Sequence, residues 1–149
     1  MKKLTLMFVL LFSIASQAAP TAIKISGKKA KNMISALVAL GVPYEGAAGT
    51  LYYSSDRVAC AVHHNTALDP SDPHFNRPTY DCNAPATENN RKAKALVNAM
   101  ITAGVPSDSG MGQTWYAVTN VVCMDHHFET STARRYSCEM TPEVEIESE

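Results

Sequence analysis

Residues 29–64 read KAKNMISALVALGVPYEGAAGTLYYSSDRVACAVHH, and residues 92–127 read KAKALVNAMITAGVPSDSGMGQTWYAVTNVVCMDHH. When residues 27–64 are aligned without gaps on residues 90–127, 13 of 38 positions are identical. Both copies contain Lys-Ala-Lys, then Gly-Val-Pro, an aromatic pair and Cys-x-x-His-His. Self-similarity at one offset of about 63 residues is typical of internal repeats. The sequence therefore predicts a tandem duplication.

Each copy begins with a predicted helix, at about 27–40 and 90–103. Apolar residues recur there at helical spacing. Ser26 precedes the first helix as a candidate N-cap. Gly41 and Gly104 are expected to end the helices in the left-handed conformation, because a proline follows two residues later in each copy.

Short apolar and aromatic runs predict the strands. We expect strands at 22–25, 51–53, 58–63, 80–82, 113–118, 121–128 and 134–140. Three segments are predicted to be loops: 44–50, 65–79 and 107–112. Residues 55–57 are interpreted as a turn or a bulge, and residues 142–147 as a charged edge strand or a solvated tail.

The predicted fold class is therefore α+β, with one helix and two or three antiparallel strands in each copy. A single helix on a small sheet leaves much of that sheet uncovered, and few residues separate the copies. We expect the two sheets to join edge to edge, with both helices packed on one face. The alternative is two separate small domains with little contact between them.

The N-terminus has the features of an export signal. Lys2 and Lys3 precede an apolar run at 4–14, and small residues at 16 and 18 favour cleavage after Ala18. The predicted organisation is a signal peptide at 1–18, a first repeat at 19–86, and a second repeat with an acidic tail at 87–149. This organisation predicts a secreted or periplasmic protein.

The charge pattern excludes a nucleic-acid-binding class. Without residues 1–18 the chain has 11 Lys and Arg against 14 Asp and Glu, and five of the acids lie at 139–149. Nucleic-acid binding normally requires a clustered basic face and a basic domain. After signal cleavage, no remaining stretch is apolar enough to predict a membrane span.

Four cysteines in an exported chain predict two disulfides. Each copy holds one cysteine in a strand and one in a Tyr-x-Cys segment. The repeat therefore predicts the pairs Cys60–Cys82 and Cys123–Cys138. Each closes a short loop and is expected to stabilise the fold by about 3 kcal/mol.

The Cys-x-x-His-His element does not predict a metal site. Adjacent histidines on a strand point to opposite faces, and a bridged cysteine cannot ligate as a thiolate. The element is read as a strand end, with one histidine half-buried and one exposed. A second hypothesis is that His64 and His127 line one shared surface that binds a partner or metal. We predict no resident metal and no cofactor.

Aromatic side chains are the other candidate binding residues. Tyr52-Tyr53 matches Trp115-Tyr116, and alternation places one member of each pair on the face away from the helices. Trp115 is either a core residue or, with Tyr52, an aromatic anchor of the kind that is enriched in protein interfaces. Phe75 in the loop 65–79 is a further candidate, as a recognition tip or as part of a tolerated insertion.

No sequence motif of a known catalytic site is present, so we predict a protein that is not an enzyme. The leading hypothesis is a disulfide-stabilised protein-binding module that inhibits a periplasmic or extracellular enzyme. In layout it resembles the bacterial β-lactamase inhibitory proteins, which are also tandem α+β repeats with one disulfide each. The alternatives are a histidine-based metal protein or small metal-dependent hydrolase, and a structural component of an envelope assembly. The oligomeric state is left open.

Overall fold

The computed structural model describes residues 21–66, 68–83, 90–127 and 134–143. In chain order, the elements are β1 (Ile23–Ser26), α1 (Gly27–Ala39), β2 (Tyr44–Ala47), β3 (Thr50–His63), β4 (Thr79–Cys82), α2 (Asn90–Ala103), β5 (Ser107–Gly110), β6 (Gln113–His126) and β7 (Arg135–Pro142). The fold class is α+β, as predicted. We call the part from α1 to β4 the first half and the part from α2 to β7 the second half.

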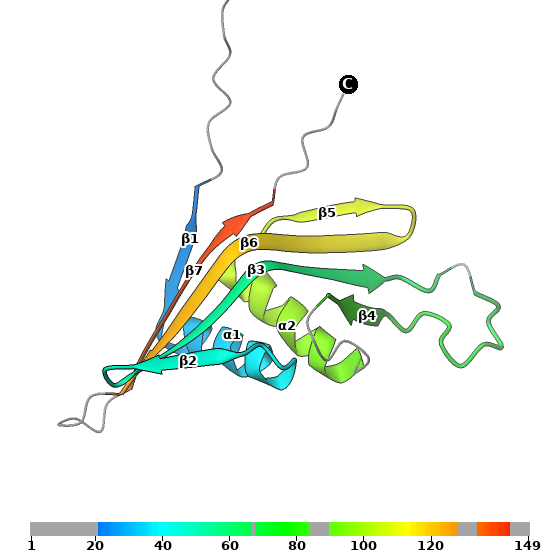
Figure 1. The fold of residues 1–149 in the computed structure, drawn as a ribbon. Coiled ribbons are helices and arrows are strands. Elements are labelled where there is room, and N and C mark those ends of the chain that lie inside the picture. The colour runs from blue at the N-terminus through cyan, green and yellow to red at the C-terminus, as the bar shows by residue number, and fades with distance from the viewer. Residues whose placement is uncertain (1–20, 67, 84–89, 128–133, 144–149) are drawn as a thin grey trace, which may run out of the picture.

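All strands belong to one antiparallel sheet (Figure 1). Its order is β1-β7-β6-β3-β2, with β4 also paired to β3 and β5 also paired to β6. The central pair is β3 with β6, which runs from Thr50 opposite His126 to His63 opposite Gln113. Because these strands come from different halves, the halves share one sheet. This confirms the prediction of a joined body.

The prediction of loops at 44–50 and 107–112 was wrong, because each segment contains a short strand. β2 pairs with β3, and β5 pairs with β6, as hairpins. Both turns have two residues at positive φ: Ala48 (49°) with Gly49 (75°), and Met111 (52°) with Gly112 (74°). Two-residue turns of this kind match the twist of paired strands. Main-chain pairing forms β2 and β5, whose exposed side chains show no apolar alternation.

The predicted interruptions of the long strands were also wrong. β3 and β6 are continuous strands of 14 residues each. Residues 55–57, interpreted as a turn or a bulge, lie within β3, and the irregularity that the structure shows is in the middle of the partner strand β6. Asn120 has a φ of 51°, and the pairing with β7 shifts register between Thr119 and Val122. A bulge keeps a strand in its sheet while bending it, whereas a turn would end it.

The helices begin and end where the sequence predicted, within one residue. Ser26 occupies the N-cap position of α1 in extended conformation, although its side chain makes no capping hydrogen bond. Gly41 (φ 80°) and Gly104 (φ 88°) follow the two helices in the left-handed conformation. That conformation carries little steric cost for glycine, and it lets the chain turn back toward the sheet.

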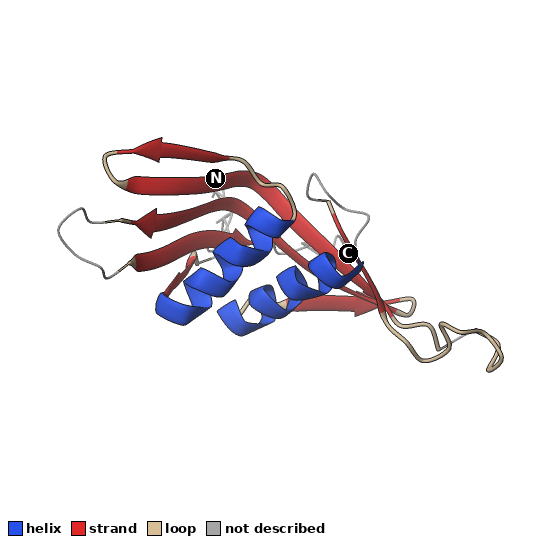
Figure 2. Cartoon of the chain, turned by 90° about the horizontal axis from the view of Figure 1, so that it is seen from below, coloured by secondary structure: helices blue, strands red, loops and turns tan. Residues whose placement is uncertain are grey.

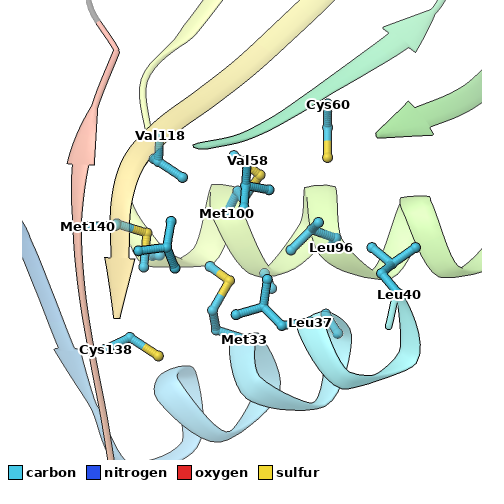
Figure 3. Packing of buried hydrophobic residues seen from close by; sticks show 14 of the residues in the cluster. Met33, Leu37, Leu40, Val58, Cys60, Leu96, Met100, Val118, Cys138 and Met140 are labelled. Atoms are coloured by element: carbon cyan, nitrogen blue, oxygen red, sulfur yellow. The ribbon is translucent and has the colours of Figure 1, made fainter. Parts of the chain in front are cut away.

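Both helices pack on the same face of the sheet, as predicted (Figures 1 and 2). The core lies between the two layers and draws on both halves (Figure 3). Its largest fully buried side chains include Met33 and Leu37 from α1, and Leu96 and Met100 from α2. Burying each such side chain contributes about 2 kcal/mol. The two halves therefore depend on a single hydrophobic core.

Both predicted disulfides are present. Cys60 is bonded to Cys82, and Cys123 to Cys138, with sequence separations of 22 and 15 residues. The Sγ atoms of Cys82 and Cys138 lie 3.8 Å from the carbonyl oxygens of Ala93 and Ala30, in the first turns of the helices. Each bridge therefore joins an outer strand to a long central strand beneath the start of a helix.

Three predictions concern residues outside the described part of the chain. They are the signal peptide at 1–18, the turn at 129–133, and the part of the predicted edge strand or tail from 144 to 147. Among the residues that are described, neither helix has the length and hydropathy needed to cross a bilayer.

Candidate functional site

The face of the sheet opposite α1 and α2 is not covered by any element of the described chain (Figure 1). We call this surface the open face. Strand alternation decides which side chains reach it. Near the His63 end of β3, Val58, Cys60 and Val62 are buried beneath the helices. Ala59 and Ala61, which lie between them, therefore point to the open face.

The alternation changes phase in the middle of the central strands. At the other end of β3, the odd-numbered Tyr53 is buried, so Tyr52 is on the open face. In β6 the buried residues change likewise from Val118 to Val121 and Cys123. The irregularity at Asn120 accounts for the change in β6, because one extra residue reverses the alternation.

The resulting open face has two apolar stretches along the central strands, and between them lie the exposed Ser54, Asp56 and Arg57, the last ion-paired with Glu143. Its side chains on the two central strands include Tyr52, Ala59, Ala61, Trp115, Ala117, Val122 and Met124. Trp115 and Val122 are 37% and 39% exposed. The exposed position of Trp115 agrees with the anchor interpretation and not with a core residue. A large accessible apolar patch is a common feature of surfaces that bind other proteins.

The two aromatic side chains of the open face do not lie together. Tyr52 is opposite Met124, whereas Trp115 is opposite Ala61. Ala61 is nine residues further along β3, which is about 30 Å at the rise of an extended strand. Tyr52 and Trp115 therefore mark two separate ends of one long surface. A partner must span both halves to contact both side chains.

Trp115 lies within the β5–β6 hairpin. A Cβ atom at Gly110 would be 3.7 Å from the Trp115 ring, so the ring lies close to the β5 backbone. Met111 at the hairpin tip is 99% exposed. These two residues make the hairpin the most accessible apolar projection on that half of the sheet. The sequence did not identify Met111, because the turn was interpreted as a loop.

The other members of the aromatic pairs belong to the helix side. Tyr53 is buried, and its ring centroid is 5.8 Å from that of the exposed Tyr44. Burial raises the pKa of the Tyr53 phenol above its ordinary 10.0, and the nearby Asp125 raises it further. Tyr116 is partly buried against the core. Tyr53 and Tyr116, both predicted binding residues, are therefore largely structural.

Phe75 is not the exposed tip that the loop prediction suggested. Its side chain is half-buried, and its N–H donates to the Asp72 carbonyl. Asp69 organises the same loop by accepting hydrogen bonds from the N–H and hydroxyl of Ser71. Those bonds lower the pKa of the exposed Asp69 carboxyl. The described residues 68–79 of this loop are therefore held by internal hydrogen bonds.

The histidine pairs hold the hairpin turns. The backbone N–H of His64 donates to the Gly112 carbonyl at 2.8 Å, and that of His127 donates to the Gly49 carbonyl at 2.7 Å. The ring Nε2 of His64 is also 3.0 Å from the Thr114 hydroxyl. Each Cys-x-x-His-His element thus closes the hairpin of the opposite half. This arrangement gives the recurrence of the element a structural reason.

The two histidine pairs lie at opposite ends of the β3–β6 ladder. His126 is opposite Thr50, while His63 is opposite Gln113. The 14-residue strands between these ends extend for about 40 Å. The hypothesis that His64 and His127 line one shared surface was therefore wrong. The described residues contain no group of three or more His, Cys, Asp or Glu side chains placed to hold a metal ion.

Asp125 and His127 form a contact that strand geometry alone did not predict. Residues two apart on one strand have backbones about 7 Å apart, yet His127 Nε2 lies 3.1 Å from Asp125 Oδ2. The Asp125 side chain is only 9% exposed, and among the described residues its Oδ1 has no hydrogen-bond partner. The contact is an ion pair when His127 is protonated. The first half has Val62 in the place of Asp125.

No protein-family model, curated protein or solved structure matches this chain. The layout likeness to β-lactamase inhibitory proteins therefore has no structural match to support it.

Proposed function

We propose that this chain is an exported, disulfide-stabilised module that binds another protein through the open face. The observation that carries this proposal is the set of uncovered apolar side chains on the two central strands, with Trp115 and Tyr52 toward its two ends. An isolated soluble sheet face is usually polar on its solvated side. Tryptophan and tyrosine are the side chains most often found at the energetic centres of protein interfaces.

The bound protein, in this proposal, is a periplasmic or extracellular enzyme that the module inhibits. A sheet whose strands are cross-linked by two disulfides loses little conformational entropy on binding, which favours tight association. The exposed Met111 tip projects beside Trp115 and suits insertion into a concave surface. Substrate and ligand sites of enzymes are concave and mostly apolar.

Tandem duplication is the proposed origin of the open face. The order helix, short strand, long strand and outer strand occurs in both halves. Equivalent cysteines form the two disulfides, and equivalent histidine N–H groups hold the two hairpins. In this account, residues 19–86 and 87–149 are repeats that joined through β3 and β6. The join doubled the length of surface available to a partner.

The proposal also includes export of the chain from the cytoplasm. Residues 1–18 have the pattern of a secretory signal, and disulfides persist in oxidising compartments. The two buried disulfides of the structure are compatible with a periplasmic or secreted protein.

The test is affinity capture with oxidised residues 19–149 from periplasmic and culture-supernatant fractions of the source cells. The variant Trp115→Ala removes the aromatic group from the open face. Val38→Ala is the matched control, because Val38 is 50% exposed on the helix side. We expect one enzyme to be retained by the wild type and by Val38→Ala, with binding by Trp115→Ala weakened at least tenfold.

The captured enzyme is then assayed with and without the purified module. Inhibition that reaches completion at equimolar module supports the inhibitor role. Capture without any effect on enzyme activity would keep the binding module and reject the inhibitor. Equal capture by Trp115→Ala and the wild type would reject the open face as the interface.

A further inference from the structure

A single row of side chains crosses four strands of the sheet at Trp115 (Figure 1). Asp81 of β4 is opposite Ala61 of β3, and Ala61 is opposite Trp115 of β6. On the other side of Trp115 lies Asp108 of β5. Residues directly opposite one another in a sheet point to the same face. The row therefore belongs to the open face, and a carboxylate stands at each end of it.

The corresponding row in the first half begins in the same way. Glu45 of β2 is opposite Tyr52 of β3. Glu45 and Tyr52 precede Asp108 and Trp115 by 63 positions each, which is the offset of the repeated pattern. We call Glu45 with Tyr52, and Asp108 with Trp115, the aromatic–acid pairs. Each half thus places an acid of its short hairpin strand beside an aromatic residue of its long strand.

The two rows differ at their far ends. The row of Tyr52 continues through Met124 to Ser137 of β7, whereas the row of Trp115 ends at Asp81. Asp81 and Asp108 are three strand spacings apart, which is about 14 Å, with Trp115 between them. The row of Trp115 therefore has two carboxylates, and the row of Tyr52 has one.

These carboxylates are not neutralised within the described part of the chain. Glu45, Asp81 and Asp108 are exposed, and none of them forms an ion pair with another described residue. Lys24 and Arg57, which belong to the same face, are already paired with other acids at 3.8 and 2.7 Å. Both aromatic side chains of the open face therefore have negative charge beside them.

An exposed carboxylate beside an aromatic ring suits a cationic side chain. The face of a ring attracts a cation, most strongly in tryptophan, and the carboxylate adds a charge-assisted hydrogen bond. The Trp115 ring lies close to the β5 backbone at Gly110, on the same strand as Asp108. A guanidinium group stacks on such a ring and donates two hydrogen bonds to one carboxylate, so arginine fits this chemistry better than lysine.

The charge of the open face disfavours two other occupants. In a face-to-face dimer, the acids of one copy would approach those of the other, and like charges across an interface oppose association. A purely apolar partner would bury Asp81 and Asp108 without a counter-charge, which is unfavourable. A basic protein surface avoids both costs.

We propose that the open face binds a basic protein surface, with an arginine of the partner seated at each aromatic–acid pair. This inference rests on the proposed function, because it names the chemistry of the protein that the open face binds. The row of Trp115 is the stronger of the two sites, since it has two carboxylates. Tyr52 and Trp115 are about 30 Å apart along the sheet, so the two arginines must be separated by a similar distance.

The first test uses the single tryptophan as a reporter. Oxidised residues 19–149 are titrated with acetyl-Arg-Ala-Arg-amide, while the emission of Trp115 and the NMR signal of its indole N–H are followed. The same peptide with citrulline in place of arginine keeps the shape and removes the charge. We expect a saturable change with the arginine peptide and at least about tenfold weaker binding of the citrulline peptide. No saturable change with the arginine peptide would overturn the proposal.

Charge variants locate the binding site. Asp81→Asn with Asp108→Asn should weaken binding of the arginine peptide at Trp115 by about fivefold or more. The control Glu45→Gln with Asp56→Asn removes the same charge elsewhere on the open face. It should keep the affinity within about twofold, because the Debye length is only about 8 Å at physiological salt. Circular dichroism verifies that both variants fold. Equal losses of affinity would mean general attraction and would overturn the proposal.

The site in the first half needs its own reporter. Tyr52→Trp in a Trp115→Phe background moves the tryptophan to the row of Tyr52. In that background, Glu45→Gln should weaken binding of the arginine peptide about threefold, whereas Asp81→Asn with Asp108→Asn should leave it unchanged. If Glu45→Gln had no effect, the proposal of two equivalent pairs would be rejected.

Capture of a protein partner separates this inference from the proposed function. A partner that is lost with Trp115→Ala but fully retained by Asp81→Asn with Asp108→Asn would overturn the inference and leave the proposed function standing. If the wild type captured no protein, the proposed function would fail, and the peptide titration would still decide whether the rows bind cations. Sedimentation equilibrium tests the remaining occupant: a dimer that Trp115→Ala abolishes would assign the open face to a second copy and overturn the inference.

Discussion

The two halves of the molecule use the same buried framework and carry different surfaces. Met33 and Leu37 of α1 occupy positions that correspond to Leu96 and Met100 of α2, and all four are buried. At the hairpin tips, by contrast, the first half has Ala48 where the second has the fully exposed Met111. Packing and turn geometry constrain the shared positions, whereas exposed positions such as Ala48 and Met111 are free to differ.

The outer strands differ in the same way. β4 has four residues and follows a long loop, whereas β7 has eight residues and continues beyond its disulfide to Pro142. β7 also pairs with β1, so the first strand of the chain is held by the second half. The position of the disulfides is common to both halves, although the strand lengths around them are not.

The largest expected effect is the loss of a disulfide. The double variants Cys60→Ala/Cys82→Ala and Cys123→Ala/Cys138→Ala should each lower the free energy of unfolding by about 3 kcal/mol. Their separations of 22 and 15 residues predict nearly equal losses. Urea unfolding followed by circular dichroism measures both. A difference above about 2 kcal/mol would show that the halves are not equivalent in stability.

The glycines in the two hairpin turns, Gly49 and Gly112, should lose different amounts of stability when each is replaced by alanine. Gly112→Ala should lower the free energy of unfolding by about 1 kcal/mol, because alanine is strained at the positive φ of this position. The new Cβ would cause no clash, since the nearest atom would be 3.8 Å away. At Gly49 the Cβ would also be 2.7 Å from the His127 carbonyl oxygen. We therefore expect Gly49→Ala to cost about 2 kcal/mol or more.

Thermal and urea unfolding of the two glycine variants provide the comparison. The Gly112→Ala variant is the matched control for backbone strain, since the two glycines have nearly the same φ. If both variants lost the same free energy of unfolding, the new Cβ at position 49 would have moved away from the His127 carbonyl oxygen at no cost in stability.

The smallest expected effect is at Asp125, where the first half has Val62. Asp125→Val should change the free energy of unfolding by less than about 1 kcal/mol. It removes the contact with His127 but also removes an unpartnered buried oxygen. Asp125→Asn is the control that keeps the shape. A loss above about 3 kcal/mol in urea unfolding would mean that the carboxylate is essential to the second half.

Local sequence signals predicted the parts of the fold that depend on neighbouring residues. The helix limits follow from apolar spacing and from Gly41 and Gly104, whose conformation is a local preference. The disulfide pairs followed from the spacing of Tyr-x-Cys in the two copies. β2 and β5 were missed because their hydrogen bonds to distant backbone, and not their side chains, make them strands.

The candidate site was predictable only in part. Tyr52 and Trp115 were identified from their pairing with Tyr53 and Tyr116, but their separation along the sheet was not. That separation depends on the register between β3 and β6, for which one strand's own sequence contains no information. Ala59, Ala61 and Ala117 were missed because alanine is not distinctive until the face it occupies is known.

The sequence by itself determined the two helices, the two disulfides and the recurrence of one pattern along the chain. These features rest on short-range chemistry, namely helical periodicity, the conformational freedom of glycine and the spacing of cysteines. Only the tertiary structure decided that β3 and β6 form one ladder and that alternation reverses at its middle. It also placed both helices on the side of the sheet opposite the open face. The partner strand and the core set a strand's register and decide which of its side chains point to each face of the sheet. They act through contacts between residues far apart in the chain.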